Sequence, residues 1–263
     1  MLKNQNPSAD ESRAFSPAFR DMGEDARNRV SAEIESEVSV DLWFWNNADE
    51  TDRSAVLFKS LNEMELARRD RHFSPEKGRH WAISRAQVRE HLAVITGSDP
   101  RALEFEENDF GRPCLVGSDL SFSVSHDGSW TVLAVSRDAS VGVDIESIQH
   151  LDREEMDWPL SPRERADLAR VAPSDRHQAF FRYWTLKEAF IKALGLGVSF
   201  PLEDFDMSAF GAKPAVLRVA GAPEAVENWD FKARQIKPDL WFALAVNSCG
   251  RTPKITYHAK NWN

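Results

Sequence analysis

The same order of elements, a strand, then helices, then further strands, occurs twice along this chain. The first copy begins with the β-branched and aromatic segment 40–46, continues with helical patterns, and ends with strand patterns and turns at 102–136. The second begins with VGVDIE at 141–146, continues with helical patterns, and ends with strand patterns that reach residue 247. Two copies of about a hundred residues indicate a duplicated fold rather than a stacked repeat array. We therefore expect two similar halves that meet along a cleft.

The patterns divide the chain into four segments. Residues 1–39 are polar and lack a sustained apolar period, which predicts a flexible extension without chemistry. Residues 40–140 form the expected N-terminal half, residues 141–247 the C-terminal half, and residues 248–263 a C-terminal tail.

Composition excludes several classes of protein. With 263 residues, 42% of them hydrophobic, the chain is long enough to bury a sizeable core. Its net charge of −9 argues against the phosphate attraction that drives nucleic-acid binding. Two cysteines are too few for a disulfide framework, and neither a signal peptide nor an apolar run of membrane length is present. We expect a cytoplasmic protein that binds neither nucleic acid nor membrane.

The segment FFRYWTLKEAFIKALGLG at 180–197 places charges among aromatic residues. At about 100° per residue, Trp184, Glu188 and Lys192 share one arc of the helix, and Lys187 lies on its flank. Charges removed from water need partners or a ligand. This arc therefore faces either solvent or something charged. A simple surface ion pair between Glu188 and Lys192, at i and i+4, is the alternative.

VGVDIES places two carboxylates on one face of a strand. Because side chains alternate in a strand, Asp144 and Glu146 point to the face opposite Val143 and Ile145. Oxygen ligands of this kind suit Mg²⁺ or Mn²⁺. The solvent-facing edge of an amphipathic strand explains the same spacing, and the pair alone does not decide between them.

Three further side chains suggest phosphate binding. Ser125 and His126 lie where a strand gives way to a turn, although a turn-capping serine beside a partly exposed histidine explains them equally well. Arg112 lies between Gly111 and Pro113, in a turn that we expect to leave its guanidinium free. Arginine suits phosphate because its planar fork donates paired hydrogen bonds.

Taken in order, GRPCL (111–115), FSVSHD (122–127), VGVDIE and the 180–197 segment resemble the successive motifs of the surfactin-type 4′-phosphopantetheinyl transferases. The resemblance spans about residues 40–247. It implies an α+β monomer of two pseudo-symmetric halves, with coenzyme A and Mg²⁺ (or Mn²⁺) in the cleft between them. The N-terminal half would then hold the coenzyme, and the C-terminal half the metal site and the catalytic helix.

The resemblance also implies roles for the charged residues of the second half. Asp144, Glu146 and Glu188 correspond to the metal ligands, and Glu188 also corresponds to the base that prepares the nucleophile. Lys187 and Lys192 correspond to phosphate contacts, with Lys192 placed to stabilise charge on the leaving group.

In the first half, the resemblance implies that Arg112, Ser125 and His126 hold the adenosine phosphates of the coenzyme. Arg79 stands where the family has a basic residue for the 3′-phosphate, and neighbouring His80 is the alternative.

Three positions carry a qualification. Glu164 corresponds to a family acid near the carrier-protein site, but a capping box with Ser161 accounts for it equally well. The chain departs from the family pattern at Asp127, where a hydroxyl residue is common, and at Arg112, where lysine is frequent. Asp127 places a negative charge near the expected phosphates.

The implied reaction transfers the 4′-phosphopantetheine group from coenzyme A to a serine of an apo acyl or peptidyl carrier protein. Two alternatives remain open: a catalytically silent coenzyme- or carrier-binding module of the same fold, and a metal-dependent nuclease. The negative net charge argues against the nuclease, and the retained carboxylates argue against the silent module.

Overall fold

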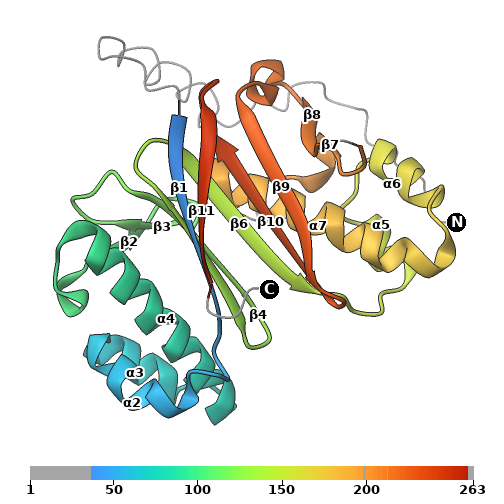
Figure 1. The fold of residues 1–263 in the computed structure, drawn as a ribbon. Helices are drawn as coiled ribbons and strands as arrows, with labels where there is room; N and C mark the ends of the chain where they lie inside the picture. Colours follow the sequence, from blue (N-terminus) through green and yellow to red (C-terminus); the bar gives the residue numbers. More distant parts are fainter. Residues whose placement is uncertain (1–36, 198–199, 212, 260–263) are drawn as a thin grey trace, which may run out of the picture.

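Two α+β halves follow one another in the computed structural model, which describes residues 37–197, 200–211 and 213–259 (Figure 1). The predicted flexible extension 1–39 lies almost wholly outside the described residues. The first half contains β1 (Glu37–Asn46), α2 (Ser54–Leu57), α3 (Glu63–Asp70), α4 (Pro75–Thr96), β2 (Phe105–Glu107), β3 (Pro113–Leu115), β4 (Ser121–Asp127) and β5 (Trp130–Ser136). The second half contains β6 (Ser140–Ser147), α5 (Arg153–Asp157), α6 (Pro162–Ala169), α7 (Arg176–Leu194), β7 (Phe205–Ser208), β8 (Ala215–Val219), β9 (Trp229–Lys237) and β10 (Leu240–Asn247).

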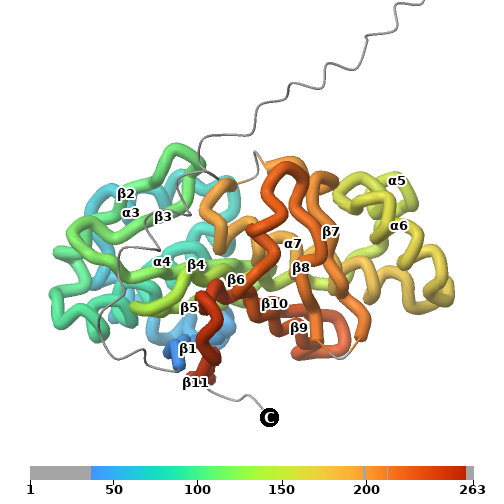
Figure 2. The backbone as a smooth tube through the Cα atoms, turned by 90° about the horizontal axis from the view of Figure 1, so that it is seen from above, coloured from blue at the N-terminus to red at the C-terminus, as the bar shows by residue number. Residues whose placement is uncertain are grey.

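The sheets confirm the predicted duplication. The strand order β1-β5-β4 in the first half matches the order β6-β10-β9 in the second, and all of these pairs are antiparallel. Each half adds a long helix, α4 or α7, and a short two-stranded sheet, β2-β3 or β7-β8. Seen from above, the two halves lie side by side, with α3 and α4 at one side, α5 and α6 at the other, and α7 near the middle (Figure 2). None of the described helices is both long enough and apolar enough to span a bilayer.

The expected C-terminal tail contains a strand. β11 (Thr252–Ala259) leaves the second half and pairs in parallel with β1, from Glu37 opposite Thr252 to Phe44 opposite Ala259. The short alternation around Ile255 is a weak strand signal because an edge strand packs only one face against a core. The last strand therefore ties the end of the second half to the first half.

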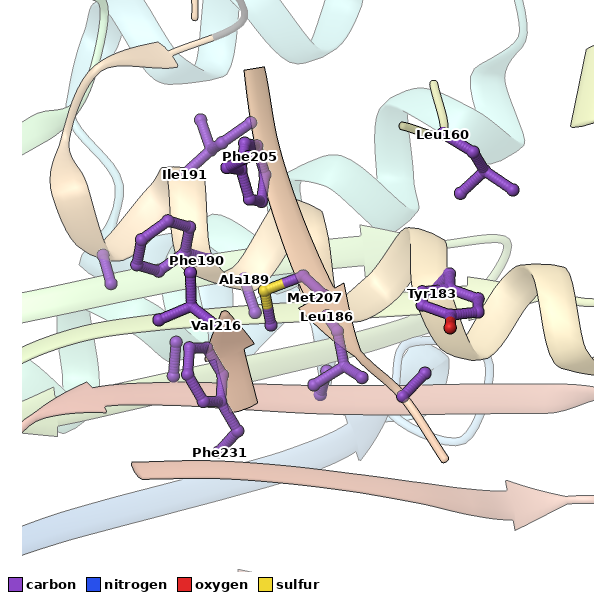
Figure 3. Close-up of a cluster of buried hydrophobic side chains, with 14 of the residues drawn as sticks. Leu160, Tyr183, Leu186, Ala189, Phe190, Ile191, Phe205, Met207, Val216 and Phe231 are labelled. Carbon is purple, nitrogen blue, oxygen red and sulfur yellow. The ribbon is translucent and has the colours of Figure 1, made fainter. Parts of the chain in front are cut away.

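Helix α7 is the central element of the second half. Its apolar side packs against β7, β8 and β9 through Phe190, Phe205, Met207 and Phe231 (Figure 3). On its other side α7 lies so close to β6 that a Cβ atom at Gly142 would overlap the backbone of Ala189 and Ala193. The helix ends at Gly195 in the left-handed region, with φ 72°, as the paired glycines predict.

The two main sheets meet at β4 and β6 through side chains. The hydroxyls of Ser121 and Ser123 accept hydrogen bonds from the backbone N–H groups of Val141 and Val143, at 3.0 and 3.1 Å. At the end of the strand, the carboxylate of Asp127 accepts one from the N–H of Ser147, at 2.7 Å. The offset is 20 residues in every case, so β4 and β6 run in parallel and in register. We call these contacts the β4–β6 seam.

Candidate active site

The face of β6 that carries the acidic residues is turned toward α7. Val143 and Ile145 are buried between the two sheets, and Asp144 and Glu146 lie on the opposite face, as the alternation predicts. Glycine at position 142 allows α7 to approach this face closely. The strand and the helix thus bring residues more than 40 positions apart into contact.

Asp144 is the most deeply buried carboxylate of the group, at 2% exposure. Its Oδ1 accepts hydrogen bonds from Ser125 Oγ at 2.8 Å and from Lys192 Nζ at 2.6 Å. Its Oδ2 is buried and has no hydrogen-bond partner among the described residues. Burial raises the pKa of Asp144, and the contacts with Lys192 and Ser125 oppose that rise.

Glu146 lies beside Asp144 on the same face. Its Oε1 accepts a hydrogen bond from the indole N–H of Trp184 at 3.0 Å. Burial, together with the negative charge of Asp144, raises the pKa of Glu146 to about 7. A divalent cation between the two carboxylates would relieve this repulsion.

Glu188 and Lys192 complete the group from α7. Lys192 Nζ also lies 2.9 Å from Ser125 Oγ, so it joins β4 and β6 through one ammonium group. Burial raises the pKa of Glu188; the charge of Lys192 opposes this rise and that of Asp144 adds to it. The structure therefore brings together five of the residues singled out in the sequence: Ser125, Asp144, Glu146, Glu188 and Lys192.

These residues fit a hard divalent cation. The unpartnered Oδ2 of Asp144 is a buried acceptor with no donor among the described residues, and Glu146 lies two residues further along the same face of β6. In the described part of the chain, no group of three acidic, histidine or cysteine side chains lies close enough together to form a metal-binding cluster. The negative charge of Asp144 is neutralised by the ammonium of Lys192. Mg²⁺ typically takes one or two carboxylates and completes its shell with water and phosphate oxygens, so such a cluster is not required.

Comparison with known proteins decides the family. Residues 140–243 match the family described as the 4′-phosphopantetheinyl transferase superfamily. The 4′-phosphopantetheinyl transferase HetI of Nostoc sp. is 30% identical over 208 residues, which cover 77% of this chain and 85% of that protein. The chain belongs to the 4′-phosphopantetheinyl transferase family.

The chain is also similar to other members of this family. A 4′-phosphopantetheinyl transferase of Bacillus subtilis is 32% identical over 162 residues, covering 61% of this chain and 70% of that protein. Among solved structures, the holo-[acyl-carrier-protein] synthase of Neisseria meningitidis covers 41% of this chain and 95% of its own, at 18% identity and a TM-score of 0.35.

Lys187, which the family resemblance predicts to contact phosphate, lies elsewhere. Its side chain is fully buried and forms an ion pair with the fully buried Glu164, with Nζ and Oε2 2.7 Å apart. Its Nζ also donates to the backbone oxygen of Phe205, and Glu164 Oε1 accepts from the N–H of Met207. An ammonium enclosed in this way does not fit a phosphate contact, because α6 and β7 surround it.

Glu164 also forms the predicted capping box. Its backbone N–H donates to Ser161 Oγ, and its Oε2 accepts from the N–H of Ser161 at 2.8 Å. The carboxylate therefore caps α6 and pairs with α7 at the same time. A single buried group holds three elements of the second half in place.

Arg112 differs from the expectation of a free guanidinium. Its Nη1 donates to the backbone oxygen of Ala193 at 3.0 Å, and its Nη2 donates to Ser121 Oγ at 2.9 Å. Longer contacts reach Ser140 Oγ and the backbone oxygen of Val141, both at 3.4 Å. Arg112 thus joins the first half to the end of α7 and to the start of β6, at one end of the β4–β6 seam.

The remaining predicted residues lie apart from the group around Asp144. His126 is exposed and lies on the face of β4 opposite Ser125, because side chains alternate along the strand. Arg79 is exposed and His80 half-buried near the start of α4, in the other half. Among the described residues, no hydrogen bond or ion pair joins any of the three to Asp144.

Sequence reasoning missed two contacts of this site. Trp184 was visible on the same arc as Glu188, but its hydrogen bond to Glu146 depends on how closely α7 packs on β6. Asp127 was noted as a departure from the family pattern, and its bond to the N–H of Ser147 depends on the side-by-side placement of β4 and β6. For the contact between Asp127 and Ser147, the sequence offered one signal: a carboxylate at position 127, where a hydroxyl residue is common in the family.

Proposed function

We propose that this chain transfers the 4′-phosphopantetheine group of coenzyme A to a serine hydroxyl of an apo acyl or peptidyl carrier protein, with Mg²⁺ as cofactor. The observation that carries the proposal is the unpartnered, buried oxygen of Asp144 beside Glu146, Glu188 and Lys192, at the junction of the two halves. Membership of the family supports the same reaction.

The charges of the site suit this reaction. Attack of the serine oxygen on the β-phosphorus forms one P–O bond and breaks the bond to the bridging oxygen, which releases adenosine 3′,5′-bisphosphate. The pyrophosphate and the leaving group are both anionic, so cationic groups favour the transition state. Asp144, Glu146 and Glu188 would hold Mg²⁺, which would supply positive charge to neutralise the pyrophosphate.

Side chains of α7 would perform the remaining steps. Glu188 is placed to accept the proton of the serine hydroxyl, and its raised pKa improves its match to a base that operates near neutral pH. Lys192 is placed to stabilise negative charge on the departing phosphate. Ser125 orients both Asp144 and Lys192 through its hydroxyl.

The two halves would contribute different parts of the active site. We propose that residues 40–140 contribute most of the coenzyme site, including Ser125 and the exposed Arg79 and His126, and that residues 141–247 contribute the metal site. We propose that the protein acts as a monomer, because β4 and β6 of one chain contribute Ser125 and Asp144 to the same group. We further propose that the protein acts in the cytoplasm, where coenzyme A and carrier proteins are available.

Intact-mass measurement of an apo carrier protein tests the reaction directly. Incubation with the full chain, coenzyme A and Mg²⁺ is expected to add one phosphopantetheine group per carrier. The Asp144→Asn and Glu188→Gln variants should lose this gain, and a carrier whose acceptor serine is replaced by alanine should remain unmodified. Absence of the gain with several acyl and peptidyl carriers, despite measured binding of coenzyme A, would contradict the proposal and favour a silent binding module.

A further inference from the structure

Asp127 is the one charged side chain of the β4–β6 seam. Its Oδ2 accepts the N–H of Ser147, the residue that directly follows Glu146. This bond fixes the backbone of β6 at the position next to a proposed metal ligand. A serine or threonine at position 127 has a hydroxyl oxygen that can accept an N–H without adding charge. The carboxylate of Asp127 therefore adds a negative charge that the hydrogen bond to Ser147 does not require.

The charge of Asp127 reaches the site. Its carboxylate is hydrogen-bonded, at 2.7 Å, to the backbone N–H of the residue that directly follows Glu146. Together with Asp144, Glu146 and Glu188 it makes four carboxylates, and the ammonium of Lys192 pairs directly with only one of them. Negative charge gathered at one place raises the local concentration of cations.

We propose that Asp127 is a positioning residue of the metal site: its carboxylate holds the end of β6 that carries Glu146, and its charge strengthens binding of the divalent cation. The inference rests on the proposed function, because it concerns the same cation. Asp127 acts through its hydrogen bond to Ser147 and through its negative charge. The proposed ligands of the divalent cation remain Asp144, Glu146 and Glu188.

The two roles of Asp127 are separable by substitution. Asp127→Asn keeps an oxygen that can accept the N–H of Ser147 and removes only the charge. Asp127→Ala removes both. Asp52→Asn makes the same change of charge at an exposed position before α2, outside the β4–β6 seam, and serves as the matched control.

Binding of Mn²⁺ measures the effect without reference to turnover. Free Mn²⁺ is followed by electron paramagnetic resonance during titration of the full chain with coenzyme A present, at pH 8 and low ionic strength. We expect Asp127→Asn to weaken Mn²⁺ binding about three- to tenfold, the size expected for one unit charge at several ångströms in a partly solvated site. The difference should narrow in high salt, because screening weakens interactions between partly exposed charges. Asp52→Asn should bind Mn²⁺ like the unmodified protein.

Thermal unfolding without metal completes the test. Asp127→Asn should unfold within a few degrees of the unmodified protein, whereas Asp127→Ala should unfold at a lower temperature because the N–H of Ser147 loses its acceptor. Unchanged Mn²⁺ affinity in Asp127→Asn, together with lost affinity in Asp144→Asn, would overturn the inference and leave the metal site intact. A large drop in unfolding temperature for Asp127→Asn would assign the residue a purely structural role. If the unmodified chain with coenzyme A binds no Mn²⁺, the proposed metal site fails, and the inference fails with it.

Discussion

The ammonium of Lys192 lies 2.6 Å from Oδ1 of Asp144 and neutralises the charge of this carboxylate. Asp144 is almost completely buried, whereas the Lys192 side chain keeps 30% of its exposure. The pair therefore places a partly exposed cation beside a buried anion. A divalent cation and Lys192 would share the charge of Asp144, one at each oxygen.

Replacement of Lys192 should make the protein depend on Mg²⁺ for stability. Lys192→Met leaves Asp144 buried without a cation, and we expect a loss of about 2 kcal/mol, less than the 3–5 kcal/mol of a fully buried pair because Lys192 is partly exposed. Chemical denaturation with and without Mg²⁺ checks this, with Lys254→Met on exposed β11 as the control. Mg²⁺ should stabilise Lys192→Met more than the unmodified protein, and an equal effect on both would contradict the proposed sharing.

Replacement of Lys187 distinguishes the buried ion pair from a phosphate contact. Lys187→Met leaves Glu164 uncompensated inside the second half, so the free energy of unfolding should fall by about 3–5 kcal/mol. The double variant Lys187→Met with Glu164→Gln should recover part of that loss, because no charge remains buried. Urea denaturation gives both values. A stable Lys187→Met protein with a strongly raised KM for coenzyme A would instead support the original expectation of a phosphate contact.

The raised pKa of Glu146 predicts opposite effects of pH on the metal-free protein and on cation binding. In the folded protein the carboxyl group of Glu146 keeps its proton up to about pH 7, whereas in the unfolded chain it loses that proton near the ordinary pKa of 4.5. The stability that this difference contributes is therefore complete below pH 4.5 and is lost as the pH rises toward 7. The unfolding temperature without metal should therefore fall between pH 5 and pH 7.5, and it should fall less in Glu146→Gln. The stabilisation produced by added Mg²⁺ should increase over the same range, since the cation competes with the proton. If the two proteins respond identically to pH, the assignment to Glu146 is wrong.

Arg112 offers a test of whether the first half is clamped to α7. Lysine has one donor group where Arg112 uses two nitrogens to reach Ala193 and Ser121. Arg112→Lys should therefore cost about 1–3 kcal/mol of stability, the size of lost hydrogen bonds to a buried charged group. Denaturation together with the KM for coenzyme A checks this, with exposed Arg101→Lys as the control. Unchanged stability with a raised KM would show that the guanidinium serves the coenzyme rather than the fold.

Much of the fold was accessible from the sequence because its signals are local. The duplicated order of elements, the capping box at Ser161 and the glycine end of α7 each depend on neighbouring residues, and the structure confirms them. β11 was missed because an edge strand packs only one face. The carboxylates of β6 were placed on the correct face by alternation alone.

Side-chain partners across the chain were beyond sequence reasoning. Lys187 and Lys192 are both lysines on one helix, yet one pairs with α6 and the other with β6. The difference follows from the rotation of α7 against β6, which depends on the close approach at Gly142. Arg112 was expected to be free because a turn was predicted around it, and the backbone oxygens that it reaches lie more than 25 positions away.

The β4–β6 seam affects which amino-acid substitutions the protein tolerates during evolution. A backbone ladder joins strands through atoms that every residue possesses, so substitutions rarely disturb its alignment. In the β4–β6 seam, by contrast, two serine hydroxyls and one carboxylate join the strands. A single substitution at one of these positions can therefore remove a contact between β4 and β6, which a substitution in a backbone ladder rarely does.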